Sequence, residues 1–207
     1  MASVCECRRQ LYEDPSQVPA QVLENHGVPS DISGRLREHW RPEAATWHRE
    51  FDLWPSKIVD DAGTSPRFLF LSGSSGNGKS HAAAWIMRRA LAKGMRCWWF
   101  DIGESIERTK REFSRQTDVP WWSWRIEKPL VVLDDIGAER SDSEFQQDLV
   151  YQWVATRYRL PVWTVVTSNL SPAELRESHP RAASRILSGP VIEMAGRDER
   201  RRKWTVR

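Results

Sequence analysis

The sequence predicts an α/β domain built on a parallel sheet, and three segments carry that prediction. Residues 73–80 match the phosphate-binding loop pattern G-x-x-x-x-G-K-[ST] at every fixed position, after an apolar run at 68–71 and before a helical apolar pattern. Two more apolar runs, 130–135 and 162–169, end in polar residues. Central strands of a parallel sheet are apolar on both faces, and their carboxyl ends open toward the ligand.

The phosphate-binding loop is the most specific of these segments and reads Gly73-Ser74-Ser75-Gly76-Asn77-Gly78-Lys79-Ser80. Its glycines let the backbone curl so that N–H groups point at phosphate oxygens, and the positive end of the following helix faces the same phosphates. Lys79 is expected to reach the β- and γ-phosphates of a nucleotide, and the Ser80 hydroxyl to ligate Mg²⁺. A chance Gly/Ser-rich turn would not require a strand before it and a helix after it, so we favour a nucleotide site.

Acidic and amide residues end the other two apolar runs. Asp134 and Asp135 close the first run, which has the form of a Walker B strand. Asp134 is expected to hold the Mg²⁺ shell and Asp135 to polarise the attacking water. The alternative is a strand followed by an acidic turn, which the upstream phosphate-binding loop disfavours. Asn169 closes the second run and could sit between that water and the γ-phosphate, or equally cap the helix that starts near Pro172.

Composition limits the class of protein. The chain has 207 residues, of which 40% are hydrophobic, enough for one domain with a sizeable core plus an appendage. No apolar run approaches the ~20 residues of a membrane span, the start has no signal-peptide core, and three cysteines argue against a disulfide scaffold. We therefore expect a soluble, cytoplasmic protein with no membrane contact. A net charge of +3 permits contact with nucleic acid without requiring it.

The N-terminal part offers weaker signals. Residues 1–42 look like a separate small piece, and Cys5 and Cys7 are half of a possible zinc site, since structural zinc takes four ligands. Residues 43–61 carry aromatic side chains at helical spacing. A helix packed on the core is the favoured interpretation, and a cover for the adenine of a bound nucleotide is the alternative.

A basic segment follows the predicted strand at 95–100. A helix is expected over 103–116, with Ile102, Ile106 and Phe113 on its inner face. Its outer surface carries four cations, namely Arg108, Lys110, Arg111 and Arg115. Three tryptophans come next, Trp121, Trp122 and Trp124. Cations can follow the phosphates of single-stranded DNA while aromatic faces stack on its bases. The alternative is that the tryptophans pack under a helix whose basic side chains are simply solvated.

Two further helices and a strand are expected in the last third of the chain. Residues 143–158 form an amphipathic pattern, with an apolar stripe of Phe145, Leu149 and Trp153 widened by Val150 and Val154. Residues 179–187 predict a short helix with Arg181 and Arg185 one turn apart on one face. A short strand over 191–194 completes the domain.

The order of these parts resembles an AAA+ ATPase of the DnaC/IstB-like branch, closest to the DnaC-type replicative helicase loaders of bacteria and phages. The resemblance is strong over about 66–195 and weak over 1–65. It rests on the phosphate-binding loop followed at once by His81, and on two phrases, Val132-Leu133-Asp134-Asp135-Ile136-Gly137 and Val166-Thr167-Ser168-Asn169-Leu170. Cys5-x-Cys7-Arg8 and Gly27-x-Pro29 are similar to the start of such loaders.

The resemblance implies a fold, ligands and roles. The fold is an AAA+ P-loop core of about five parallel strands over 43–207, without the usual helical lid, preceded by a partner-binding extension over 1–42 that would contact a replicative helicase hexamer. ATP and Mg²⁺ are the implied ligands, with 73–80 and His81 at the nucleotide. Asn169 falls at sensor 1, and Arg185 falls at the arginine finger that completes a neighbouring subunit's site in an oligomer, with Arg181 beside it. The segment 103–125 falls where such proteins contact single-stranded DNA.

Four functions are compatible with these residues to different degrees. An ATP-dependent loader of a replicative DNA helicase, acting in the initiation of DNA replication, fits best. An IstB-type transposition helper would use the same ATPase on another client. An ATP-binding assembly module with little hydrolysis stays open, because Asp135 stands where a Glu is commoner. A P-loop kinase would not account for Asn169 or for the helix with Arg181 and Arg185.

Overall fold

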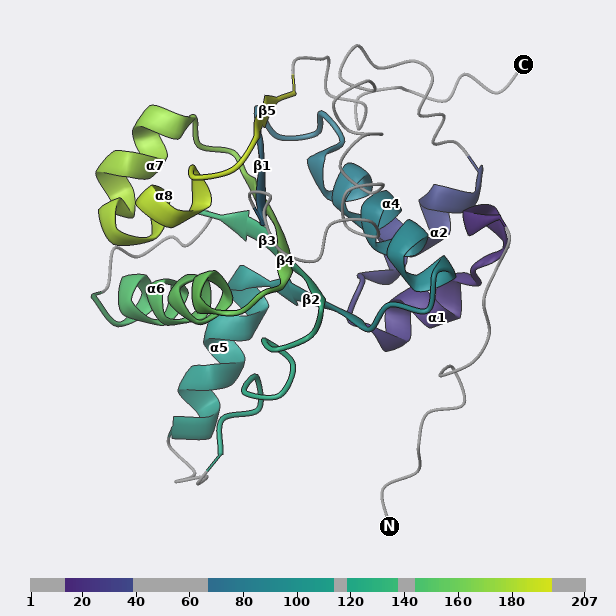
Figure 1. Cartoon of the computed structure of the whole chain (residues 1–207), viewed down its shortest axis with the longest axis horizontal. Helices are drawn as coiled ribbons and strands as arrows, with labels where there is room; N and C mark the ends of the chain where they lie inside the picture. The colour runs from purple at the N-terminus through teal and green to yellow at the C-terminus, as the bar shows by residue number, and fades with distance from the viewer. Residues whose placement is uncertain (1–13, 39–66, 114–118, 138–143, 195–207) are drawn as a thin grey trace.

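A five-stranded parallel sheet lies between two layers of helices in the computed structural model, which describes residues 14–38, 67–113, 119–137 and 144–194 (Figure 1). The strands are β1 (Phe68–Ser72), β2 (Cys97–Asp101), β3 (Leu130–Ile136), β4 (Trp163–Ser168) and β5 (Val191–Glu193). Their order in the sheet is β2-β3-β4-β1-β5, and every neighbouring pair is parallel. The α/β class and the number of strands predicted from the sequence are confirmed.

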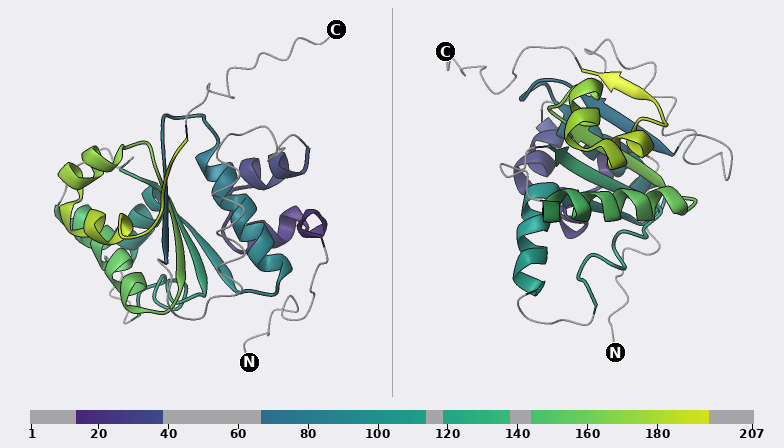
Figure 2. Two further views of the ribbon diagram at one scale, coloured as in Figure 1. Left: turned by 45° about the horizontal axis from the view of Figure 1, so that its top comes forward. Right: turned by 90° about the vertical axis from the view of Figure 1, so that its left-hand side faces the viewer.

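The helices cover both faces of this sheet (Figure 2). They are α1 (Ala20–Asn25), α2 (Ser30–Glu38), α4 (Lys79–Ala92), α5 (Ile102–Phe113), α6 (Glu144–Arg159), α7 (Pro172–Ser178) and α8 (Pro180–Ile186), with a short 3₁₀ turn, η2, at Pro15–Gln17. The α4 layer includes α1 and α2, and the opposite layer holds α5 to α8. None of the described helices is both long and apolar enough to cross a membrane.

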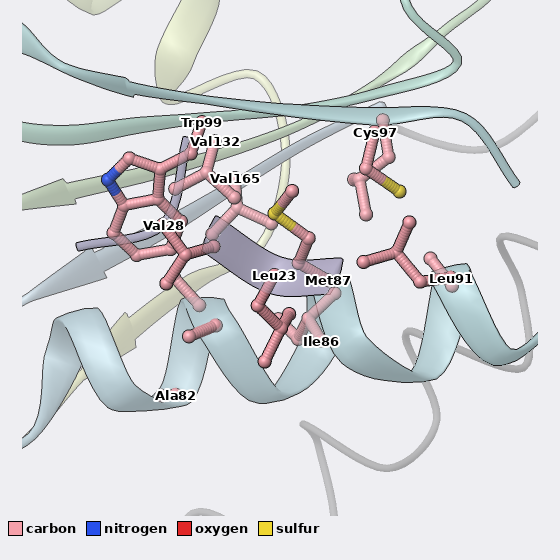
Figure 3. Packing of buried hydrophobic residues seen from close by; sticks show 14 of the residues in the cluster. Leu23, Val28, Ala82, Ile86, Met87, Leu91, Cys97, Trp99, Val132 and Val165 are labelled. Carbon is pink, nitrogen blue, oxygen red and sulfur yellow. The ribbon is translucent and has the colours of Figure 1, made fainter. Parts of the chain in front are cut away.

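Alternate residues of the central strands belong to two separate hydrophobic clusters, one on each face of the sheet. In β1, Leu69 and Leu71 face the α4 layer, while Phe68 and Phe70 face the layer of α6 and α8. This alternation follows from the two-residue period of a strand, which must be apolar on both faces when helices cover both. Figure 3 shows the α4 side of this packing, where α4 meets strand residues and part of α1.

The described part of the N-terminal segment packs on α4 rather than standing apart from it. Val18, Leu23 and Val28 are buried in the same cluster as α4. The backbone N–H of Trp99 in the edge strand β2 donates to the carbonyl of His26 at 2.9 Å. Residues 39–66 lie outside the described part, so the domain boundary at 42 and the helix over 43–61 stay predictions, as does the missing lid.

A tight turn lets the N-terminal helices approach β2 so closely. Gly27 has φ +92, and a Cβ built there would lie 2.7 Å from the carbonyl oxygen of Trp99. Glycine meets both demands, since it adopts positive φ without strain and leaves room for the neighbouring backbone. The close contact also covers part of an otherwise unpaired sheet edge.

Two aromatic residues expected in the core are exposed. Phe113 is 66% exposed and Phe145 40% exposed. Phe113 is the last residue of α5 and Phe145 the second of α6, and their rings pack on each other edge to face, with centroids 5.6 Å apart. Both segments are helical as their periodicity predicts, but periodicity does not show that the helix ends lie at the periphery of the core.

Candidate nucleotide site

The phosphate-binding loop joins the carboxyl end of β1 to the first residue of α4. Gly73, Gly76 and Gly78 all have positive φ, which is the conformation that a curled loop of backbone N–H groups requires. A Cβ on Gly73 would lie 2.4 Å from the carbonyl oxygen of Met194, so this position accepts no side chain. Because the loop leads into the amino end of α4, its N–H groups and the helix dipole favour an anion at the same place.

Lys79 is almost fully buried within the loop. Its ammonium donates to the carbonyl oxygens of Gly73 at 2.7 Å and Ser74 at 2.8 Å. It also donates to the side-chain oxygens of Asn169 at 2.9 Å and Asn77 at 3.3 Å. These four acceptors are neutral oxygens, so the negative charge of a β- or γ-phosphate would improve on them. The position and charge of Lys79 therefore fit a nucleoside triphosphate.

Asp134 is buried beside Ser80 and lacks the environment that a carboxylate prefers. Thr167 donates its hydroxyl to Asp134 Oδ1 at 2.6 Å. Burial raises the pKa of Asp134 to about 6, against the hydrogen bonds from Thr167 and Ser80 and with a smaller contribution from the neighbouring charge of Asp135. A buried carboxylate next to a serine hydroxyl at the end of a phosphate-binding loop is a donor set that suits Mg²⁺. Ser80 and Asp134 therefore fit the predicted metal position.

Asp135 and Asn169 extend this arrangement toward Lys79. Asp135 has φ +65, a left-handed conformation that costs a non-glycine residue about 1–3 kcal/mol. Its backbone N–H donates to the Thr167 hydroxyl at 2.9 Å, and its carboxylate accepts from Asn169 Nδ2 at 2.8 Å. Since Asn169 also accepts from Lys79, one amide connects the ammonium to the carboxylate.

Asn169 does not cap the helix that follows it, which was one of its two interpretations. The helix α7 is capped by Ser171, whose side chain accepts from the N–H of Glu174, while Glu174 accepts from the N–H of Ser171. Asn169 instead makes its hydrogen bonds with Lys79 and Asp135. His81, also predicted at the nucleotide, lies in the first turn of α4 and is partly exposed.

Thr167 was not among the predicted site residues, yet its hydroxyl accepts from the backbone N–H of Asp135 and donates to the side chain of Asp134. This single hydroxyl contacts the carboxylate of Asp134 and the backbone of Asp135 at the end of the predicted Walker B strand. The signal was a hydroxyl residue near the carboxyl end of an apolar strand, at a position where β4 pairs with β3. That neighbour relation is set by the order of strands and is not visible along the chain.

The arginine pair of α8 contacts α6. Both helices lie in the layer opposite α4 (Figure 1). Arg185 donates to the carbonyl of Arg181 at 2.8 Å and to the hydroxyl of Tyr151 at 3.4 Å. Arg181 pairs with Asp148 at 3.1 Å and lies over the ring of Tyr151 at 3.8 Å. These contacts are all with α6 or within α8, so Arg185 is not part of the hydrogen-bonded group around Lys79.

The basic residues of α5 are engaged mostly by their own helix. Lys110 pairs with Glu107 at 2.7 Å, and Arg111 donates to the carbonyl of Glu107 at 3.2 Å. Arg108 lies over the ring of Trp121 at 4.2 Å and pairs with a glutamate one turn on. Exposed ion pairs of this kind are weak, so phosphate oxygens could replace the glutamate oxygens. Arg115 lies outside the described residues.

The three tryptophans after α5 divide into two roles. Trp121 and Trp122 are half-buried against the hydrophobic cluster of α5 and α6. Trp121 donates its indole N–H to the Thr109 hydroxyl at 3.1 Å, which anchors the segment to α5. Trp124 is 51% exposed, with the guanidinium of Arg125 at 4.1 Å from its ring. Two of the three indoles thus support the fold, and the third faces outward.

The two cysteines of the possible zinc site, Cys5 and Cys7, lie outside the described residues. Within the described ranges there is no group of three or more His, Cys, Asp or Glu side chains that could hold a metal ion. The predicted Mg²⁺ position is of another kind, since it would combine one carboxylate with a hydroxyl and the phosphates of the nucleotide itself.

In the nucleotide-free protein, ionised Asp134 should lower stability at neutral pH. A carboxyl group whose pKa rises from 3.8 to about 6 on folding binds its proton more tightly in the folded state. Stability therefore falls as the pH rises from about 4 to about 6 and stays lower above that range. Asp134→Asn should be more stable than the parent above pH 7, by roughly 1–3 kcal/mol, and this advantage should shrink as the pH approaches 4.

Denaturant unfolding of both proteins across this pH range, with a chelator present, measures the difference. Asp148→Asn is the matched control, because Asp148 is half exposed and its pair with Arg181 is worth little. If the advantage of Asp134→Asn were the same at pH 4 and pH 7, the raised pKa would be wrong.

Comparisons with known proteins agree with this architecture. A family model described as RNA helicase matches residues 69–169. No curated protein matches the sequence. Among solved structures, the DnaC helicase loader has a TM-score of 0.64 at 24% identity, over 76% of this chain and 95% of that one. DnaI has a TM-score of 0.66 at 21% identity, over 85% of this chain and 98% of that one.

A third structure, the replication initiator DnaA bound to AMPPCP and single-stranded DNA, has a TM-score of 0.62 at 20% identity, over 78% of this chain and 50% of that one. The sheet order, the phosphate-binding loop and these neighbours together define an AAA+ P-loop NTPase fold, which in general binds nucleotide with Mg²⁺. Within that class, the fold is the one of DnaC-like AAA+ ATPases, and the predicted resemblance is confirmed.

Proposed function

We propose that the protein is a cytoplasmic, ATP-dependent loader of a replicative DNA helicase, which binds single-stranded DNA and hydrolyses ATP between subunits during the initiation of DNA replication. The observation that supports this most is the hydrogen-bonded path from Lys79 through Asn169 to Asp135, beside the buried Asp134, on a fold shared with DnaC and DnaI. A phosphate-binding lysine and a candidate water-polarising carboxylate are thus joined in one site.

The reaction that fits these residues is phosphoryl transfer from ATP to water. The N–H groups of residues 73–80 and the ammonium of Lys79 bind the β- and γ-phosphates, replacing the carbonyl oxygens that Lys79 now contacts. Ser80 and Asp134 would hold Mg²⁺, which would supply positive charge to the phosphates. Asp135 orients the attacking water and accepts its proton, and Asn169 fixes the carboxylate of Asp135 by its 2.8 Å hydrogen bond.

Arg185 is the candidate for stabilising the charge that develops during phosphoryl transfer. Charge builds up on the transferring phosphoryl group, and an arginine supplied by a neighbouring subunit can stabilise it. Arg185 contacts Tyr151 of α6 in its own chain, in the helix layer opposite α4. We therefore assign it to the nucleotide site of the next subunit, so that hydrolysis requires self-association.

The client is tested by co-purification. The full chain, loaded with ATP and Mg²⁺, is mixed separately with a purified replicative helicase hexamer and with a transposase. We expect it to bind the helicase through residues 1–42, the proposed partner-binding extension. Binding to the transposase alone would reject the loader and favour the IstB-type helper. Binding to neither would favour an ATP-binding assembly module with little hydrolysis. The residue that favours this alternative is Asp135, which is one methylene shorter than the glutamate that is commoner at its position.

Replacing Lys110 and Arg111 with alanine should weaken binding of single-stranded DNA. Both side chains are exposed on α5 and their contacts with Glu107 are of the weak surface kind. For each cation removed from the DNA backbone, the slope of log affinity against log salt should fall by roughly 0.7, because fewer counterions are released. Fluorescence anisotropy of a labelled oligonucleotide at several salt concentrations measures both effects.

The matched control is the double replacement of Lys93 and Arg96 with alanine. It removes the same charge from the exposed turn between α4 and β2. The control should lose much less affinity than the α5 variant. Equal losses in the two variants would mean that overall charge, and not α5, determines binding.

A further inference from the structure

Both arginines of α8 contact one aromatic ring. The guanidinium carbon of Arg181 lies 3.8 Å from the ring centroid of Tyr151, and that of Arg185 lies 5.1 Å from it. Arg185 also donates to the hydroxyl of Tyr151 at 3.4 Å. The ring of Tyr151 therefore meets one guanidinium with its face and the other with both its face and its hydroxyl.

We propose that Tyr151 is a positioning residue for the arginine finger: it holds Arg181 and Arg185 together in one orientation from which Arg185 enters the neighbouring subunit's site. This inference rests on the proposed role of Arg185 in hydrolysis. Tyr151 does not touch the nucleotide, and it acts through the arginine.

Electrostatics explains why a ring is needed at this place. Arg181 and Arg185 are one turn apart on the same face of α8, where like charges repel. The only carboxylate paired with Arg181 in the described structure is Asp148, and both side chains of that pair are more than half exposed, so the pair is weak. The negative face of an aromatic ring attracts both cations without neutralising either, which leaves Arg185 charged for the phosphoryl group.

The packing of α6 and α8 makes the ring a fixed support. On α6, Val150 and Val154 flank Tyr151 in sequence by one and three residues and are fully buried in the core. On α8, Ala182 and Ala183 are buried in the same cluster. Because both helices are anchored in one core, the distance between the ring and the base of Arg185 is well defined.

A fixed ring restricts the conformations of the long Arg185 side chain. A free arginine has many rotamers and loses conformational entropy when it is held in one geometry. Arg185 is already restricted by its hydrogen bond to the carbonyl of Arg181 and by the rings of Tyr151 and Tyr158, the latter 5.7 Å away. Much of the ordering is therefore complete before two subunits meet, which is the general advantage of preorganisation.

The first test separates turnover from nucleotide binding. Tyr151→Ala should lower kcat roughly tenfold, the scale of one cation–π interaction, while KM for ATP changes less than about twofold. Tyr151→Phe keeps the ring and should retain kcat within about threefold. Phe145→Ala is the matched control, because it removes another exposed ring from α6. Thermal unfolding of each variant shows that it is folded.

The second test is complementation between subunits. Mixing Tyr151→Ala with Lys79→Ala should raise activity above the mean of the two proteins, because the Lys79 variant donates an intact arginine pair to intact sites. Mixing Tyr151→Ala with Arg185→Ala should give no such gain, because both defects lie on the donor side of the interface.

The outcomes distinguish this inference from the role of Arg185 itself. If Tyr151→Ala and Arg185→Ala complement each other, Tyr151 does not act through the finger and the inference fails alone. An equal loss of kcat in Tyr151→Ala and Phe145→Ala would also reject it. If Arg185→Ala is not rescued by Lys79→Ala, the finger role fails, and the role of Tyr151 fails with it.

Discussion

Lys79→Ala should bind ATP at least about thirtyfold more weakly than the parent and show no measurable turnover. The ammonium of Lys79 is buried and already surrounded by oxygen acceptors from the loop and from Asn169. Losing one partner of a buried charge–phosphate pair typically costs about 2–5 kcal/mol, which corresponds to roughly 30- to several-thousandfold in affinity. Equilibrium binding of a fluorescent ATP analogue and steady-state phosphate release measure the two quantities.

Asp135→Asn serves as the matched control for this prediction. It removes the water-polarising carboxylate while Asp134 and Lys79 remain, so it should bind ATP nearly as the parent does and still fail to hydrolyse it. Thermal unfolding shows whether either variant has lost its fold. Normal steady-state turnover in both variants would show that the site around Lys79 is not where hydrolysis occurs.

Arg185→Ala should lose turnover by about a thousandfold or more and retain nearly normal ATP binding. An arginine finger contributes on that order in P-loop NTPases, because it meets charge that develops only in the transition state. Arg185 lies in the layer of α6 and α8, so its removal leaves the loop around Lys79 intact. Mixing Arg185→Ala with Lys79→Ala should restore part of the activity, since each supplies the half that the other lacks.

Arg181→Ala is the comparison that assigns the finger. Arg181 sits one turn away on α8 and pairs with Asp148. We expect a much smaller loss than for Arg185→Ala, because Arg181 supports its neighbour and does not reach the phosphates. A thousandfold loss in Arg181→Ala with a small one in Arg185→Ala would reverse the two roles. A protein that hydrolyses ATP fully as a dilute monomer would exclude a finger supplied in trans.

Local chemistry allowed much of the fold to be predicted. The glycines of residues 73–80, the lysine that follows and the apolar runs on either side are constraints between neighbours in sequence. Strand β1 covers the expected apolar run at 68–71, and helix α4 follows the loop as the helical apolar pattern predicts. The polar ends of β3 and β4 could likewise be predicted to meet, because parallel strands bring their carboxyl ends to one edge of a sheet.

Other features could not be predicted from the sequence pattern, because they depend on contacts between residues that are distant in the chain. Asn169 could cap a helix or join the site, and the presence of Ser171 at the cap together with the nearness of Lys79 settles its hydrogen bonds. Phe113 and Phe145 follow a helical stripe and yet are exposed, because a stripe does not show where the core ends. The packing of residues 14–38 on α4 had no periodic signal of its own.

The burial of Arg157 is another feature that could not be predicted from the sequence. Near the end of a helix this arginine looks like an exposed cation, but it is fully buried. It donates to the hydroxyl of Thr164 at 2.9 Å and to the carbonyl of Ile126 at 2.9 Å, tying the turn before β3 to the start of β4. The loop, the strands and the candidate charged residues of the site could be predicted from patterns along the chain. Which of those charges are buried could not, because burial depends on side chains far away in sequence that the order of the strands brings together.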